Sequence, residues 1–170
     1  MLISTNILRD GDLDFDYIVT DNAQKIFEAL TNTKGKAAKC FNLIGSYGTG
    51  KSSFLVAFEQ TLLGKQQFFD TKGLPKSPVF VKIVGSHASF QKALSKALGM
   101  RTNSSVEKIL EVLESTGKGG RPVYVLVDEL GKHLEHALAH NPKEDTYFFQ
   151  QIAEAINNPD INEIGIVEDS

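Results

Sequence analysis

The stretch GSYGTGKSS, residues 45–53, decides the fold of this chain. It lies between two apolar runs, which predict a strand before it and a helix after it. Its spacing is G-x-x-x-x-G-K-[ST], with Gly45, Gly50, Lys51 and Ser52 at the defining positions. Glycines let several backbone N–H groups converge on one point, and a helix that begins there turns its positive end toward an anion. The pattern predicts a phosphate-binding loop; the alternative is a flexible turn between strand and helix.

The side chains of this loop have separate expected tasks. Lys51 would place a point charge on the β- and γ-phosphates, and the Ser52 hydroxyl would bind Mg²⁺. Ser53 is a candidate contact of the α-phosphate. The predicted nucleotide-binding residues are Gly45, Ser46, Tyr47, Gly48, Thr49, Gly50, Lys51, Ser52 and Ser53.

A second apolar run, VYVLV at residues 123–127, ends in Asp128 and Glu129. Five apolar residues without alternation are typical of a strand that is covered on both faces. A carboxylate at the end of such a strand is well placed to reach a metal ion, so Asp128 joins Ser52 as a predicted metal ligand. Glu129 is predicted to deprotonate the attacking water, which makes Glu129 and Lys51 the candidate catalytic residues. The alternative is a helix start, with Asp128 as N-cap and Glu129 in the first turn.

Strands and helices are predicted to alternate along the chain. The expected strands cover 40–45, 79–85, 123–127 and 163–167. Between and after them, apolar residues at helical spacing predict six helices, which begin near Thr20, at the phosphate loop, near Phe90, at Ser104 with Glu107 as a capping box, at Leu130 and before Phe148. In the helix after Glu129, Leu130, Leu134, Ala137 and Leu138 are the expected inner face. The order indicates an α/β fold with three αβα layers and a mainly parallel sheet.

Composition sets limits on the class of protein. The chain has 170 residues, enough for one domain, and its formal net charge is −3. Its three arginines are Arg9, Arg101 and Arg121, so nucleic-acid binding stays possible but has no support from charge. No apolar run is long enough for a membrane helix, and the N-terminus lacks the pattern of a secretory signal. We expect a cytoplasmic protein with no membrane association. The single cysteine, Cys40, is given no chemistry.

Together, GSYGTGKSS and VYVLVDE, with the strand VFVKIV between them in sequence, resemble the additional-strand, catalytic-glutamate division of P-loop NTPases, which includes the AAA-like ATPases. In that resemblance the two motifs are the Walker A loop and the Walker B strand. The segments DYIVT, DELGKHLEHA and TYFFQQIAEAINNP are similar to the N-terminal ATPase modules of large bacterial proteins of anti-phage defence clusters. The resemblance spans roughly residues 15 to 160.

This resemblance implies a Mg²⁺-dependent ATPase that works as a homo-oligomer or as a subunit of a larger complex, with ATP and Mg²⁺ as cofactors. ATP is expected rather than GTP because the base-reading N/T-K-x-D signature is absent. The implied biology is antiviral defence, in which hydrolysis drives conformational change or assembly. An alternative is an ATP-binding switch or interaction module with little or no hydrolysis. A small-molecule kinase is disfavoured, since the arginines that a phosphate-covering lid needs are few and scattered.

The C-terminal part departs from the family pattern. EIGIV is the candidate fourth strand, and Glu168, Asp169 and Ser170 are poor candidates for the polar sensor that relatives carry there. No fifth strand follows, which leaves an edge of the phosphate-loop strand open to pairing. We therefore expect one P-loop NTPase domain over 1–170, with residues 1–20 as an N-terminal extension and the C-terminal part of the usual fold missing.

Three weaker signals have a functional and a structural interpretation. His133, His136 and His140 share one predicted helix face and with Glu129 suggest zinc, but a polar outer face is the favoured interpretation. Lys132 is a candidate phosphate contact or, by preference, a solvated lysine. The resemblance suggests that Tyr17 and Thr20 frame an adenine, and packing is the alternative for the tyrosine.

Overall fold

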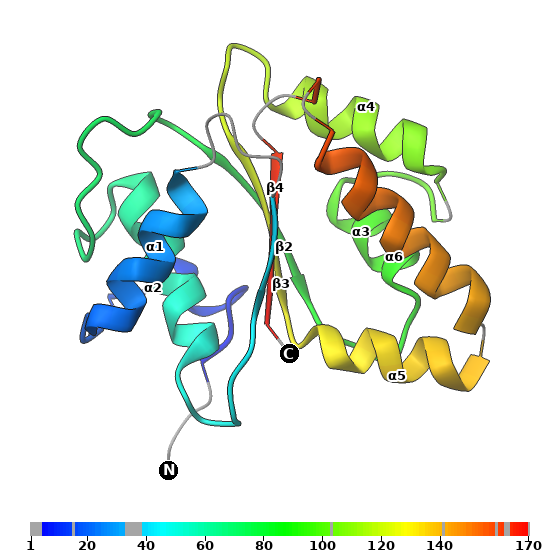
Figure 1. Ribbon diagram of the computed structural model, residues 1–170, viewed down its shortest axis with the longest axis horizontal. Helices are drawn as coiled ribbons and strands as arrows, with labels where there is room; N and C mark the ends of the chain where they lie inside the picture. The colour runs from blue at the N-terminus through cyan, green and yellow to red at the C-terminus, as the bar shows by residue number, and fades with distance from the viewer. Residues whose placement is uncertain are drawn as a thin grey trace.

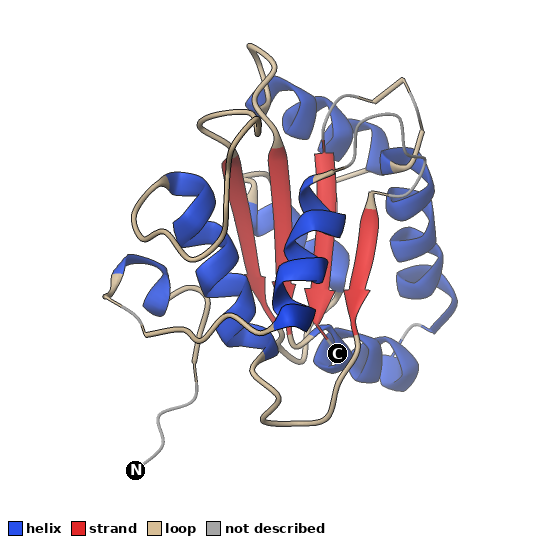
Figure 2. Ribbon diagram, turned by 60° about the vertical axis from the view of Figure 1, so that its left-hand side comes forward, coloured by secondary structure: helices blue, strands red, loops and turns tan. Residues whose placement is uncertain are grey.

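The computed structural model describes residues 5–14, 16–32, 39–102, 104–140, 142–158, 160–161 and 164–169. Its centre is a sheet of four parallel strands, whose arrows all point the same way in Figure 2. The strands are β1 (Cys40–Leu43), β2 (Val79–Val84), β3 (Val123–Asp128) and β4 (Ile164–Asp169), and their order in the sheet is β1-β4-β3-β2.

The helices of the described residues fall into two groups, which lie on opposite faces of the sheet in Figure 1. The first group is α1 (Asp21–Thr31) and α2 (Lys51–Leu63). The second group is α3 (Phe90–Ala97), α4 (Val106–Thr116), α5 (Leu130–His140) and α6 (Pro142–Ile156). The α/β class, the three layers and the parallel sheet that the sequence predicted are confirmed, and together with the loop motif they give a P-loop NTPase-like fold.

The strand order differs from the order of the strands in the sequence. β4 lies between β1 and β3, where Cys40 aligns with Ile166 on one side and Val125 aligns with Ile166 on the other. β2, which separates the two motifs in the sequence, lies at the sheet edge next to β3. Among the described strands β1 pairs only with β4, so its second edge has no strand partner in the part of the chain that the structure describes.

The core has two halves because side chains alternate between the faces of the sheet. Val125 and Val127 of β3 pack toward α3, α4 and α6, whereas Leu126 packs toward α1 and α2. On the side of α1 and α2, the ring of Phe58 of α2 contacts the ring of Tyr124 of β3 edge to face, with ring centroids 5.1 Å apart. This packing fixes α2, and with it the loop at its start, against the central strand.

The N-terminal residues also pack on the α2 side. Ile7 is fully buried there, and the short 3₁₀ helix η1 (Asp10–Asp12) follows it. Gln60 of α2 donates a hydrogen bond to the Leu13 carbonyl at 2.7 Å, and the hydroxyl groups of Thr5 and Ser53 are 3.1 Å apart. This segment therefore lies along α2 as far as the phosphate loop.

Two helix predictions need correction. In α5 the buried residues are Leu130, His133 and Ala137, while Leu134 is 40% and Leu138 74% exposed. The N-cap of α4 is Ser105, one residue later than predicted, and its side chain accepts from the Lys108 amide. In α1 the N-cap is Thr20, near which the helix was predicted to begin. Glu163 and Ser170 lie outside the described residues.

Candidate functional site

The predicted phosphate loop connects the carboxyl end of β1 to the first turn of α2. Gly48 and Gly50 have φ angles of 81° and 87°, in the left-handed region where a Cβ is strained. A Cβ on Gly45 would approach the Thr49 hydroxyl to 2.9 Å, so this glycine allows the loop to close tightly. The Thr49 hydroxyl donates to the Ser46 carbonyl at 2.8 Å and braces the turn. The local structure therefore needs glycine where the motif has it.

Lys51 is the first residue of α2 and is half-buried. Its ammonium group donates to the Gly45 carbonyl at 2.8 Å and reaches the Ser46 carbonyl at 3.5 Å. The side chain thus folds back across its own loop, and its positive charge lies beside the helix start. Both the charge and the helix dipole favour an anion there.

Ser52 joins the loop to the second motif. Its hydroxyl is 2.9 Å from Oδ1 of Asp128, which is the last residue of β3 and is 3% exposed. The two residues are 76 positions apart in the chain, and the parallel arrangement of β1 and β3 brings their ends to the same edge of the sheet. Lys51 and Asp128 therefore border one site rather than opposite faces of the molecule.

Glu129 is the single residue between β3 and α5. Its φ is 60°, and its carboxylate accepts a hydrogen bond from the Lys132 ammonium at 2.6 Å. This contact raises the pKa of Lys132. The side chain of Lys132 is 43% exposed, as the preferred prediction of a solvated lysine requires, and it also forms an ion pair with the candidate base.

A groove of about 560 Å³ runs from the loop toward the start of α1. Besides the loop, its walls include Tyr17, Thr20, Ile26 and Phe54. Tyr17 also packs on Phe68, with ring centroids 5.8 Å apart, and burial raises the pKa of its hydroxyl. Thr20 caps α1 by accepting from the Ala23 amide. The packing role of Tyr17 and a position beside the loop are thus compatible.

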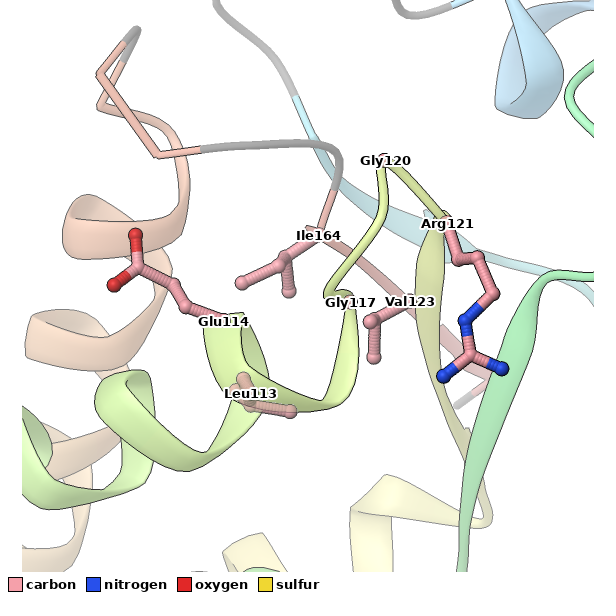
Figure 3. Close-up of a pocket in the computed structure, with 7 residues that line it drawn as sticks. All are labelled: Leu113, Glu114, Gly117, Gly120, Arg121, Val123 and Ile164. Carbon is pink, nitrogen blue, oxygen red and sulfur yellow. The ribbon is translucent and has the colours of Figure 1, made fainter.

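A second cavity, of about 200 Å³, lies at the opposite end of the sheet, where β3 and β4 begin (Figure 3). Leu113, Val123 and Ile164 line it. The charged ends of Glu114 and Arg121 point away from these apolar side chains in Figure 3. This cavity lies far from the phosphate loop, and we assign it no part in the chemistry there.

The histidines of α5 do not form a metal site. No group of three or more His, Cys, Asp or Glu side chains among the described residues is arranged to hold a metal ion. His133 is 1% exposed, and its Nδ1 lies 2.7 Å from the Ala88 carbonyl. The prediction of a polar outer face is wrong for His133, which is buried.

Sequence reasoning gave too little weight to Glu168. It lies in β4, aligned with Asn42 of β1 and Val127 of β3, and is 8% exposed. Burial raises its pKa to about 7. Its position near the end of a strand was visible in the sequence, but its burial depends on β4 being placed between two other strands. On the same face burial raises the pKa of the Cys40 thiol to about 11.

Comparisons with known proteins give limited information. PCH-2 from C. elegans is one of seven solved chains that match, with a TM-score of 0.43 and 20% sequence identity. The matched region covers 88% of this chain and 34% of PCH-2, so the chain spans about a third of the length of that solved chain. The low TM-score means that the fold assignment rests on the chain's own strand order and loop. No family model matches the sequence, and no curated protein matches it. Among the described residues no helix has the length and apolar character to cross a bilayer.

Proposed function

We propose that this chain is a Mg²⁺-dependent module that binds and hydrolyses ATP. The observation that carries the proposal is the 2.9 Å contact between the Ser52 hydroxyl and the Asp128 carboxylate at the start of α2. It joins a glycine loop, a lysine and a buried acid in one site. A helix start that binds anions, next to a carboxylate that binds cations, suits a phosphate ligand with a bound divalent cation.

The donor set fits Mg²⁺. A serine hydroxyl and a buried aspartate carboxylate are hard oxygen ligands, which this ion prefers, and they already lie within hydrogen-bond distance of each other. Ser52 and Asp128 would therefore hold the ion. When bound, Mg²⁺ supplies charge neutralisation on the phosphate oxygens. The remaining tasks belong to the chain itself: the loop amides and Lys51 bind and orient the triphosphate.

Glu129 is the residue we assign to the proton transfer. It follows Asp128 directly, so its carboxylate lies at the same edge of the sheet as the proposed ion ligands. A carboxylate that accepts a proton from a water molecule activates that water for attack on the terminal phosphate. The groove beside Tyr17 and Thr20 extends from the loop and would receive the nucleoside, with ATP expected over GTP.

The strand order supports the additional-strand division of P-loop NTPases, because β4 lies between the strand that leads into the loop and the strand that carries Asp128. Proteins of that kind act through oligomers, and the edge of β1 that has no strand partner among the described residues is compatible with assembly. We extend the proposal to conformational change or assembly in a larger complex. The motif likeness to defence-cluster ATPases makes antiviral defence the first biological setting to examine.

Two variants test the function. We expect Lys51→Ala to lose ATP binding, measured by calorimetry, because the loop then lacks its cation. Glu129→Gln should keep ATP binding but lose phosphate release, because an amide cannot accept the proton. Normal turnover in the Glu129→Gln variant would remove Glu129 from the mechanism, and tight binding by the Lys51→Ala variant would contradict the site.

The wild-type chain should be measured at several protein concentrations. A specific activity that rises steeply with concentration would favour active sites completed between subunits. Tight binding with negligible turnover at every concentration would instead establish the alternative, an ATP-binding switch. Retention on DNA at low salt is a separate measurement, since the net charge gives no reason to expect it.

A further inference from the structure

The backbone of Glu129 adopts a conformation that most side chains avoid. Among the described residues, Glu129 and Ser77 are the non-glycine residues with positive φ, at 60° and 56°. A left-handed residue with a Cβ costs about 1–2 kcal/mol and persists only where its surroundings hold it. The contacts that hold Glu129 therefore decide where its carboxylate points.

Gly85 forms one side of this support. It follows β2, and its amide donates to the Asp128 carbonyl at 2.7 Å, which continues the pairing of β2 with β3. A Cβ on Gly85 would lie 2.0 Å from the Glu129 carbonyl oxygen and 2.8 Å from its carbonyl carbon. These are backbone atoms, so the clash has no flexible side chain to absorb it. The absence of a side chain at 85 makes room for the turn at 129.

Lys132 forms the other side and binds Glu129 twice. Its amide donates to the Glu129 carbonyl at 3.2 Å, and its ammonium donates to Oε2 of the carboxylate at 2.6 Å. The two side chains are 43% and 44% exposed. An ion pair this exposed adds little to the stability of the fold. The ion pair instead fixes the position of Oε2 of Glu129. Because the carboxylate group is rigid, this also sets the direction in which Oε1 points.

We infer that Gly85 and Lys132 are positioning residues for the base Glu129: Gly85 leaves space for its left-handed backbone, and Lys132 fixes the direction of its carboxylate. This inference rests on the proposed function. A displacement of about 1 Å at a reacting group costs up to roughly 100-fold in rate. Residues that only hold the base in place can therefore have a large effect on kcat. Neither residue belongs to the phosphate loop, and ATP affinity should not depend on them.

The first test uses three lysine variants in steady-state phosphate release. Lys132→Met keeps the length of the side chain and removes its charge, and we expect kcat to fall about tenfold while KM changes less than about twofold. Lys132→Arg restores a donor to the carboxylate and should recover most of kcat. Lys108→Met removes an exposed lysine from α4 and serves as the control, with unchanged kinetics. An unchanged or higher kcat in Lys132→Met would overturn the role of Lys132.

The second test compares two glycines of the same region. Gly85→Ala introduces the clash with the Glu129 backbone, and we expect kcat to fall by about 100-fold with ATP affinity retained. Gly131→Ala adds the same methyl group two residues after Glu129, where nothing lies within 4 Å, and should leave kcat unchanged. Equal kcat in the two alanine variants would overturn the role of Gly85.

The outcomes separate this inference from the function on which it rests. Wild-type protein without turnover at any concentration overturns both. Wild-type turnover that Glu129→Gln abolishes, together with unchanged kcat in Lys132→Met and Gly85→Ala, overturns the positioning roles alone. If Gly85→Ala does not fold, the lysine series still decides the role of Lys132, because Lys132 is a partly exposed side chain whose replacement leaves the core intact.

Discussion

The helices α2 and α5 begin in similar places, and each is entered through a left-handed backbone residue, but the type of that residue differs. Each follows a parallel strand at the carboxyl edge of the sheet, and each is preceded by a left-handed residue. Before α2 this residue is Gly50, with φ of 87°; before α5 it is Glu129, with φ of 60°. Glycine adopts this conformation without strain, whereas glutamate does not.

The difference follows from what each turn presents. At α2 the useful groups are backbone amides, and nothing is lost when the side chain is absent. At α5 the useful group is a carboxylate, so the Cβ must stay and the strain is tolerated. The space that this turn needs comes from Gly85, where a Cβ would lie 2.0 Å from the Glu129 carbonyl oxygen. Each turn thus depends on a glycine, but the turn before α2 contains its glycine, whereas the turn before α5 depends on Gly85 from the segment after β2.

The largest effect is expected from breaking the turn that has glycine. Gly50→Ala forces a Cβ into a left-handed residue of the phosphate loop, and we expect ATP affinity to fall by at least about 100-fold because the amides no longer converge. Gly64→Ala is the matched control: it caps the other end of α2 with φ of 70° and also has nothing within 4 Å. It should carry a similar stability cost and keep ATP affinity. Calorimetry and thermal melts separate the two, and equal affinities would contradict the role of the loop.

The next effect tests the contact that joins the two turns. Ser52→Ala removes the hydroxyl that lies 2.9 Å from Asp128, and we expect the gain in ATP affinity on adding Mg²⁺ to fall about 30-fold. Ser53→Ala removes a neighbouring hydroxyl whose described partner is Thr5 and should keep the Mg²⁺ gain. Titration of ATP with and without Mg²⁺ measures this gain. A Ser52→Ala variant with the full gain would show that the ion, if bound, has other ligands.

β4, which lies between β1 and β3, contains a buried carboxyl group, Glu168, whose charged form is destabilised by burial. Burial raises the pKa of Glu168 to about 7, so the folded state favours the neutral form. The stability this provides is complete below the unfolded pKa near 4.5 and is lost as the pH rises through about 7. We expect the melting temperature to fall by about 5–10 °C between pH 5 and pH 8 from this group. Glu168→Gln, which stays neutral, should remove that part of the slope; an unchanged slope would contradict the burial of its charge.

The sequence predicted the features that depend on neighbouring residues. The glycine spacing located the loop, apolar periodicity placed the helices to within a few residues, and the uninterrupted run at 123–127 identified the buried strand β3. The ends of parallel strands meet at one edge, so even the approach of Ser52 to Asp128 followed from fold class. The tasks given to these side chains stay predictions until nucleotide binding is measured.

Features that depend on distant contacts could not be predicted. In α5 leucines and histidines both recur at helical spacing, so periodicity alone did not decide which set faces inward. The Ala88 carbonyl, from the loop after β2, accepts a hydrogen bond from His133 at 2.7 Å and holds this histidine on the inner side with Leu130 and Ala137. The same holds for Gly85, whose importance appears only where β2 meets the turn after β3. Both cases involve the segment after β2, which has no motif of its own.

The smallest effect measures the strain at Glu129 directly. Glu129→Gly and Glu129→Ala both remove the carboxylate and its ion pair, so the difference between them reports the Cβ in a left-handed backbone. We expect the glycine variant to be more stable by about 1 kcal/mol, or roughly 3 °C in melting temperature. The same pair at Glu135, an exposed position inside α5, should show the opposite order, because alanine favours a helix. If alanine were the more stable at both positions, the turn before α5 would be unstrained, and the contrast with Gly50 would disappear.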